Sequence, residues 1–159
     1  MRPLIGAYLR QIDCFTGERD APVVAARQSQ PKEINMFDRL SSYAPQVLSV
    51  LRIITALLFI AHGTQKLFGF PIAAQGPTEG LMLVAGILEV AGGLLVLVGF
   101  FTRPVSFILC GMMAVAYWMV HAPMGFWPAG NFGDAAVLFC FVFGYFVFAG
   151  PGAWSLNKQ

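Results

Sequence analysis

The sequence predicts an all-α fold, an integral membrane bundle of four transmembrane helices, and three observations support this prediction. Of the 159 residues, 57% are hydrophobic and only 11% are charged, whereas soluble domains have about 25% charged residues. Eleven of the 18 charged residues fall in residues 1–45, so the rest of the chain is nearly uncharged. Four apolar segments then follow, and because backbone groups in lipid must pair within their own segment, helices are favoured over open strands.

This composition also excludes several classes of protein. So few charges cannot cover a soluble surface, which argues against a typical cytosolic enzyme, a disordered chain and a nucleic-acid binder. The net charge of +2 is too small to indicate an acidic partner. The three cysteines form no C-x-x-C pattern, so neither a redox motif nor a metal site is predicted. Cys110 and Cys140 are interpreted as small apolar residues within helices.

Residues 1–45 are interpreted as a polar N-terminal tail. Residues 1–35 show no sustained periodicity and no basic start followed by an apolar core, so they do not resemble a cleavable signal peptide. A loose tail is one interpretation. The alternative is that residues 1–35 are an upstream mis-start and that translation begins at Met36. That start would leave the membrane domain, residues 46–157, complete.

The four apolar segments have recognisable ends. The first covers about residues 47–70 and ends at Pro71, and the second covers about 80–101 and ends at Arg103-Pro104. The third covers about 105–122 and ends at Pro123. The fourth covers about 134–149 and ends at the sequence Gly150-Pro151-Gly152. Each end carries the proline or glycine that typically stops a helix.

Basic residues predict the orientation. They lie in the N-terminal tail, at Arg103 between the second and third segments, and at Lys158, whereas the other two loops, about 71–79 and 123–133, have none. The positive-inside rule therefore places both termini in the cytoplasm.

Polar residues within the first segment share one helical face. Positions 52, 55, 59, 62 and 66 follow one another at steps of three and four, so Arg52, His62 and Lys66 are expected to face the interior of the bundle. A competing interpretation is that Arg52 and Lys66, which lie near the segment ends, extend to the membrane surface instead.

Five ionisable residues are predicted to lie in the outer half of the membrane. Depths counted at about 1.5 Å per residue place them there, and they are the candidate ligand-binding residues: His62, Lys66, Glu89, His121 and Asp134. His62 and His121 differ in depth by about 6 Å by the same count, which argues against a haem held between them. For Asp134 the alternative is a plain cap on the fourth helix.

Glu89 is the most informative single residue. Its helical neighbours Ala85, Gly86, Gly92 and Gly93 are all small, so another helix can approach closely, and a carboxylate there needs a partner or a proton. Lys66 and His62 are the candidate partners by depth. The catalytic candidates are therefore Glu89, Lys66 and His62, and the alternative is a purely structural Glu–Lys tie.

The arrangement of short motifs resembles the DoxX family. The resemblance covers about residues 46–157. It rests on the following segments: Leu51-Arg52, Ala61-His62-Gly63-Thr64-Gln65-Lys66-Leu67-Phe68-Gly69-Phe70, Gly86-Ile87-Leu88-Glu89-Val90-Ala91-Gly92-Gly93, Gly99-Phe100-Phe101-Thr102-Arg103-Pro104, Asn131-Phe132-Gly133-Asp134 and Gly150-Pro151-Gly152-Ala153-Trp154-Ser155-Leu156. Two positions depart from the family pattern, since Asp134 stands where Glu is common and Asn157 where Asp is common.

The resemblance implies a multi-pass protein of a bacterial inner membrane. The family is named for its likeness to the membrane subunit of a thiosulfate:quinone oxidoreductase, and some members are thought to join redox assemblies. The leading hypothesis is therefore a membrane subunit of an oxidoreductase assembly that contacts quinone and has lipid, a redox partner subunit and further copies of itself as partners. No flavin, haem or iron–sulfur motif is present, so electrons would come from that partner. The alternatives are a non-catalytic scaffold or anchor, and a small transporter or proton path.

Overall fold

The computed structural model describes residues 36–72 and 79–157, and every regular element in these residues is a helix. The predicted loose tail, residues 1–35, lies outside the described residues. The elements in chain order are α2 (Met36–Ser41), α3 (Ala44–Phe68), α4 (Leu81–Val98), α5 (Thr102–Ala116), the π-helical turn η2 (Tyr117–His121), the 3₁₀ turn η3 (Ala122–Met124), α6 (Pro128–Asn131) and α7 (Asp134–Ala149).

Three stretches are long and apolar enough to cross a membrane. They are α3, α4 and the continuous stretch Thr102–Met124, which joins α5 to η2 and η3. The fourth predicted segment forms α7 with the predicted bounds, but its 16 residues make it a shorter apolar helix. The all-helical class is thus confirmed, and three of the four predicted spans are helices long and apolar enough to cross a membrane.

The predicted helix ends differ from the observed ones by a few residues. Helix α3 begins at Ala44 rather than near residue 47, and α5 begins at Thr102 rather than Val105. In both helices a proline occupies the first turn, where its missing N–H has no helical partner to lose. Helix α4 ends at Val98 because Gly99 takes a left-handed conformation with φ of 72°. The short helices α2 and α6 were not predicted.

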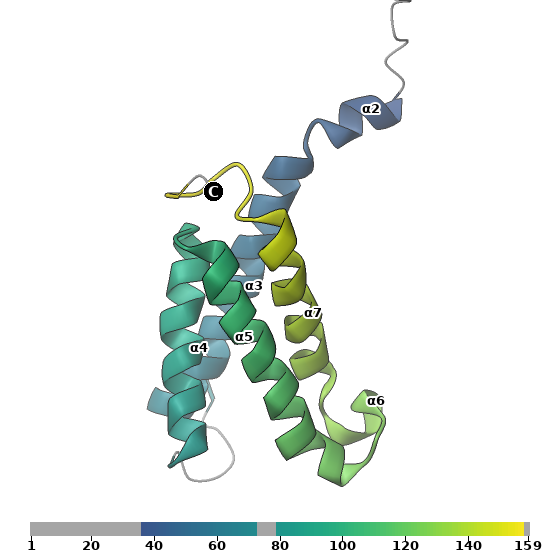
Figure 1. The fold of residues 1–159 in the computed structure, drawn as a ribbon. Coiled ribbons are helices and arrows are strands. Elements are labelled where there is room, and N and C mark those ends of the chain that lie inside the picture. Colours follow the sequence, from purple (N-terminus) through teal and green to yellow (C-terminus); the bar gives the residue numbers. More distant parts are fainter. Residues whose placement is uncertain (1–35, 73–78, 158–159) are drawn as a thin grey trace, which may run out of the picture. The chain divides into compact units, whose positions relative to one another are not determined.

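The long helices pack as two pairs, α3 along α4 and α5 along α7 (Figure 1). Glycines allow the first pair to approach closely, because a Cβ added to Gly63 would lie 2.7 Å from Val90 Cγ2 and 2.9 Å from the Val90 backbone nitrogen. Aromatic contacts connect the two pairs. The Phe59 ring of α3 lies 4.8 Å from the Phe143 ring and 5.1 Å from the Phe139 ring, centroid to centroid, both in α7.

The segment after α7 folds back over the start of α3 and the end of α4. The Ala153 N–H donates to the Pro45 carbonyl at 3.1 Å, and the Leu156 N–H donates to the Val98 carbonyl at 3.1 Å. This C-terminal segment, residues 150–157, therefore closes one end of the bundle. The opposite end holds the end of α3, the start of α4 and the residues between η3 and α7 (Figure 1).

Candidate functional site

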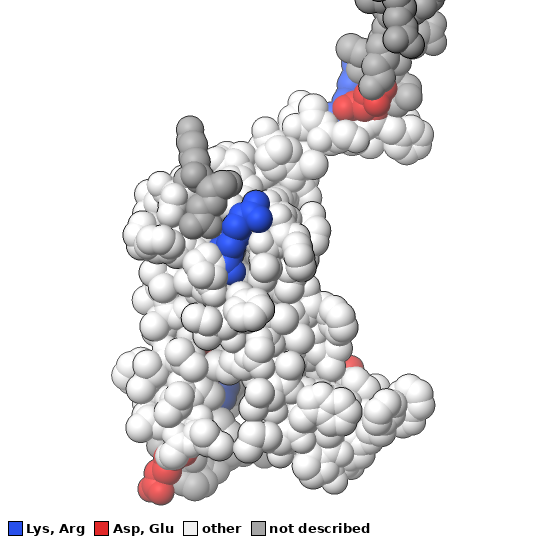
Figure 2. All heavy atoms as spheres, in the orientation of Figure 1, with Lys and Arg blue, Asp and Glu red and all other residues white. Residues whose placement is uncertain are grey.

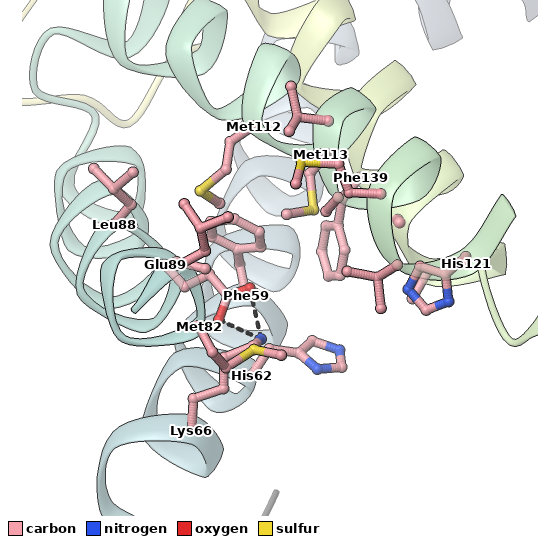
Figure 3. Close-up of a pocket in the computed structure, with 18 of the residues that line it drawn as sticks. Phe59, His62, Lys66, Met82, Leu88, Glu89, Met112, Met113, His121 and Phe139 are labelled. Atoms are coloured by element: carbon pink, nitrogen blue, oxygen red, sulfur yellow. Dashed lines mark hydrogen bonds and ion pairs between the residues drawn. The ribbon is translucent and has the colours of Figure 1, made fainter. Parts of the chain in front are cut away.

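A cavity of about 450 Å³ lies between the two helix pairs, toward the end of the bundle opposite the C-terminal segment. Its walls come from α3, α4, α5, η2 and α7, and most of the lining is apolar, with Phe59, Met112, Met113 and Phe139 among the contributors (Figure 3). Its volume and character are typical of a site for a small organic ligand. Four of the five predicted site residues line it: His62, Lys66, Glu89 and His121.

The pairing of Lys66 with Glu89 defines the polar wall of this cavity. Lys66 Nζ donates to Glu89 Oε1 at 2.8 Å and to Glu89 Oε2 at 2.6 Å. The Glu89 side chain is only 5% exposed and that of Lys66 is 19% exposed. The competing interpretation that Lys66 extends to the membrane surface is therefore wrong, because its ammonium group turns inward to a buried carboxylate from the neighbouring helix. Both charges are neutralised where they face an apolar space.

The small residues around Glu89 act as the sequence indicates. A Cβ on Gly86 would lie 3.0 Å from Leu67 and 3.3 Å from Lys66 Cβ, so this glycine brings α3 close enough for the ion pair to form. A Cβ on Gly92 would meet Leu109 of α5 at 2.8 Å. The site is thus held by close helix packing on two sides of α4.

His62 lies on the same wall as Lys66, one helical turn earlier in α3. Its ring makes an edge contact with Phe139 of α7, with 5.7 Å between centroids. Figure 3 shows the imidazole beside the Lys66–Glu89 pair. Position 62 therefore brings a titratable ring to the cavity, as the helical face predicts.

His121 reaches the cavity from the other helix pair. It ends the π-helical turn η2, which widens the helix by one residue per turn and is a feature often found at functional sites. Its Nδ1 lies 3.0 Å from the backbone oxygen of Asn131. Asn131 itself is fully buried, and its side chain accepts from the Gly133 N–H at 2.8 Å and donates to the Gly125 carbonyl at 2.6 Å.

Asp134 does not join the other four candidates. It is exposed in the first turn of α7 and is not among the residues that line the cavity, because the face of this turn that meets the cavity carries Ala135 and Ala136. Its side chain makes no capping hydrogen bond in the described residues, where Gly133 occupies the N-cap position. The structure does not bring Asp134 to the cavity with the other candidates. It lies in the first turn of α7, where the helix dipole favours a carboxylate, but it makes no capping hydrogen bond within the part of the chain that the structure describes.

The cavity opens toward the side of the bundle. Several lining residues of α4, α5 and η2 are strongly exposed, among them Val84, Val115 and Met119. Figure 2 shows that this face carries almost no charge between its two ends. Atoms of a basic residue are visible in a recess between α4 and α5, which agrees with Lys66 lining the cavity. In a membrane such an uncharged face meets lipid, so the opening would admit a lipophilic molecule from the side.

Arg52 has a role that the sequence analysis missed. Its side chain is fully buried, and the guanidinium donates to the carbonyls of Val96 at 2.6 Å, Leu97 at 2.7 Å and Pro151 at 2.8 Å, and also to that of Trp154. The interpretation that Arg52 extends to the membrane surface is therefore wrong. Val96 and Leu97 lie in the last turn of α4, which ends at Val98, and the helix dipole there favours a cation. The turn Gly150-Pro151-Gly152 returns backbone carbonyls toward α3. It is the sequence signal that could have indicated these hydrogen bonds to Arg52.

The described cysteines have packing roles. Cys110 of α5 and Cys140 of α7 are free thiols whose sulfurs lie 3.7 Å apart. A Cβ added to Gly144 would lie 3.6 Å from Cys110 Sγ, so Cys140 and Gly144, two small residues four positions apart on α7, both face Cys110 of α5. The interpretation of both cysteines as small apolar helix residues agrees with this placement.

Apolar helices, an almost uncharged flank and a buried ion pair beside an apolar cavity define a helical membrane protein with an internal ligand-sized cavity. The chain belongs to the DoxX family, whose sequence pattern matches residues 47–122. It is 42% identical to a protein of Haemophilus influenzae described as uncharacterized, over 77% of this chain and 96% of the relative. It is also 29% identical to the inner membrane protein YphA of Escherichia coli, over 72% of this chain and 91% of that protein.

A further relative is the inner membrane protein YqjF of Escherichia coli, which is 26% identical over 69% of this chain and 88% of that protein. The chain thus covers nearly the full length of all three relatives. No solved structure matches it significantly.

Proposed function

We propose that this protein is a multi-pass protein of the bacterial inner membrane and serves as the membrane subunit of an oxidoreductase assembly that binds quinone in the cavity between the helix pairs. In this proposal α7 is the fourth span and both termini are cytoplasmic. The inner-membrane descriptions of two relatives and the three long apolar helices support the location. Surrounding lipid, a redox-active partner subunit and further copies of the chain are the proposed partners.

One observation carries the ligand part of the proposal: an apolar cavity in the helical bundle has hydrogen-bonding groups on two facing walls. Quinones are flat, apolar rings with polar atoms at opposite edges, and they dissolve in membranes. The Lys66–Glu89 pair and His62 lie on one wall and His121 on the other (Figure 3). The apolar lining suits the ring, and the opening between α4 and α5 would let an isoprenoid tail remain in lipid.

The chain's own residues would bind and orient the ring and keep water from it. Bound quinone supplies the electron-accepting chemistry. Lys66 and Glu89 can hold or release protons only at the cost of breaking a buried ion pair. An imidazole nitrogen can donate or accept a hydrogen bond without breaking that pair, so His62 and His121 are the better suited groups for proton exchange with a ring oxygen.

A binding assay with a matched pair of variants tests this proposal. The full chain in lipid nanodiscs is titrated with a decyl-tailed benzoquinone, and quenching of tryptophan fluorescence reports binding. Ala85 lines the cavity from α4, whereas Ala91 on the same helix is exposed and does not line it. Ala85→Leu should fill part of the cavity and weaken binding at least about tenfold, and Ala91→Leu should leave it unchanged.

Three outcomes would contradict the proposal. Equal effects of the two leucine variants would mean that the quinone partitions into lipid and does not occupy the cavity. Absence of saturable binding, together with a partner protein that still co-purifies, would favour the scaffold alternative. Ion or solute flux in proteoliposomes that Ala85→Leu blocks would favour the transporter alternative.

A further inference from the structure

The hydrogen bond of His121 determines what its ring can offer to a ligand. Its Nδ1 lies 3.0 Å from the Asn131 backbone oxygen, and a carbonyl oxygen can only accept. Nδ1 therefore carries the proton. In a neutral imidazole the second nitrogen, Nε2, then has a lone pair and acts as an acceptor. Because His121 lines the cavity and Nδ1 is engaged with the loop, Nε2 is the ring nitrogen left for a ligand.

This carbonyl belongs to Asn131, the last residue of α6, which several hydrogen bonds hold in place. The Asn131 side chain is 0% exposed and bonds to Gly133 and Gly125, as described above, and its Nδ2 lies 3.5 Å from the Tyr117 hydroxyl. That hydroxyl in turn donates to the Phe126 carbonyl at 2.5 Å, and the Tyr117 and His121 rings stack with 6.5 Å between centroids. One connected hydrogen-bond network, which joins η2 to the residues before α7, thus sets the orientation of the His121 ring and determines which of its nitrogens carries the proton.

The opposite wall presents acceptors together with the Lys66 ammonium donor, so it suits either redox form of the ligand and leaves the preference to His121. The Glu89 carboxylate has two oxygens that only accept in its ionised state, and Lys66 keeps it in that state by direct contact. His62 makes no hydrogen bond within the described residues that would fix its tautomer. A quinone carbonyl placed against His121 would bring two acceptors together, whereas a hydroquinone has a hydroxyl donor at each end of its ring.

We propose that the cavity binds the reduced, hydroxyl-bearing form of its ligand, a lipophilic hydroquinone, more tightly than the quinone, and that His121 Nε2 accepts the hydrogen bond of one ring hydroxyl. This inference rests on the proposed quinone site and specifies the chemical form that the site favours. One neutral hydrogen bond in place of an acceptor–acceptor contact should give a preference of about tenfold. Such a preference would raise the midpoint potential of the bound couple by about 30 mV, which favours electron transfer from a partner to the bound quinone.

Paired titrations test the preference. The decyl-tailed benzoquinone and its hydroquinone are titrated under argon into the full chain in nanodiscs by calorimetry. The unaltered protein should bind the hydroquinone about tenfold more tightly. His121→Phe keeps an aromatic ring but removes the acceptor, and it should bring the two affinities to within about twofold. Asp134→Asn, exposed at the same end and outside the cavity, should leave the ratio unchanged.

A spectroscopic measurement keeps the proposal testable if His121→Phe does not fold. The chain has only two histidines, so ¹⁵N-histidine labelling of the His62→Gln variant leaves the His121 ring alone in the spectrum. Its Nδ1 should give the signal of a protonated nitrogen and its Nε2 that of an unprotonated one. Addition of hydroquinone should shift the Nε2 signal in the direction of a hydrogen-bonded acceptor.

The possible failures are distinguishable. If neither form of the ligand binds saturably, the proposed quinone site fails and this inference fails with it. If both forms bind with equal affinity, or the quinone binds more tightly, the quinone site stands and the inference is overturned. A protonated Nε2 in the unliganded protein would also overturn it.

Discussion

Lys66 Nζ lies 2.8 Å from Glu89 Oε1 and 2.6 Å from Glu89 Oε2, so one ammonium group joins α3 to α4 through both oxygens of a buried carboxylate. The contact faces an apolar cavity, where neither charge has bulk water to replace its partner. Removal of either group therefore leaves the other as an unpaired buried charge, which destabilises the protein. Removal of both groups leaves no unpaired charge and should destabilise it less.

The first prediction is energetic coupling between these two residues. Glu89→Gln and Lys66→Met should each lower the free energy of unfolding in detergent by about 3–5 kcal/mol. The double variant should lose less than the sum of the single losses by about 1–3 kcal/mol. Equilibrium unfolding in mixed micelles, followed by far-UV circular dichroism, measures all three changes.

A control cycle separates direct coupling from general fragility. Arg103 donates to the Val147 carbonyl at the other end of the bundle and does not line the cavity. Glu89→Gln combined with Arg103→Met should be additive to within about 0.5 kcal/mol. Additive losses for Lys66 and Glu89 would mean that the ion pair contributes nothing beyond its separate side chains.

The second prediction concerns the hydrogen bonds that the Arg52 guanidinium donates to four backbone carbonyls. A guanidinium can reach four carbonyls from three nitrogens, whereas an ammonium has one nitrogen at the end of a flexible chain. Arg52→Lys should therefore leave buried carbonyls unpaired and destabilise the protein by about 2–4 kcal/mol. The C-terminal segment should also become sensitive to carboxypeptidase, because Arg52 binds its carbonyls at Pro151 and Trp154.

Arg103→Lys is the matched control for this experiment. Arg103 is only partly buried and makes a single 3.1 Å hydrogen bond to a carbonyl, so its replacement should cost less than about 1 kcal/mol. Equal carboxypeptidase rates for the two lysine variants would argue that the C-terminal segment is held by its backbone hydrogen bonds alone.

The helices and the Lys66–Glu89 pair could be predicted because their signals are local or periodic. Apolar length indicates a helix, and a three–four spacing puts His62 and Lys66 on one face. Small residues around Glu89 indicate where another helix comes close. These signals depend only on side-chain types and their spacing, which the sequence shows directly.

The roles of Arg52 and Asn131 could not be predicted in the same way. The partners of both side chains are mainly backbone groups, which exist at every position and leave no pattern in the sequence. The π-helical turn that ends at His121 likewise has no signature in residue spacing. Asp134 was placed in the site by depth alone, but depth does not say which side of the first turn of α7 faces the cavity.

The third prediction tests how closely α3 and α4 pack. Gly63 is buried, and an added Cβ would lie 2.7 Å from Val90 Cγ2, 2.9 Å from the Val90 backbone nitrogen and 3.0 Å from Glu89 Cβ. Since a backbone atom is among these neighbours, a side-chain rotation cannot relieve the overlap and the helices must separate. Gly63→Ala should lower the free energy of unfolding by about 1–3 kcal/mol, measured by equilibrium unfolding in mixed micelles with far-UV circular dichroism.

Gly111→Ala is the control for helix propensity. Gly111 is an exposed glycine within α5, and an added Cβ there meets nothing within 4 Å. Alanine should therefore be neutral or should stabilise the protein by up to about 1 kcal/mol, because alanine favours a helix more than glycine does. A similar loss of stability from both alanine variants would contradict the close approach of α3 and α4.

The fourth prediction tests the proposed topology. Arg103 lies in the turn between α4 and α5, and the described loop residues 122–133 at the other end of the bundle carry no Lys or Arg. The positive-inside rule then places the Arg103 turn, and both termini with it, in the cytoplasm. A fluorescent reporter that folds only in the cytoplasm should be active when fused after Gln159. An alkaline phosphatase reporter, active only after export, should be active when inserted after Gly125.

The same fusions test whether α7 crosses the membrane despite its 16 residues. At about 1.5 Å per residue it spans roughly 24 Å, short of a typical hydrocarbon core, so local thinning of the bilayer would have to accommodate it. If α7 does not cross, the reporters after Gly125 and after Gln159 will lie on the same side of the membrane. An active phosphatase after Gly125 together with an inactive fluorescent reporter after Gln159 would contradict the four-span topology, while activity of both reporters would support it.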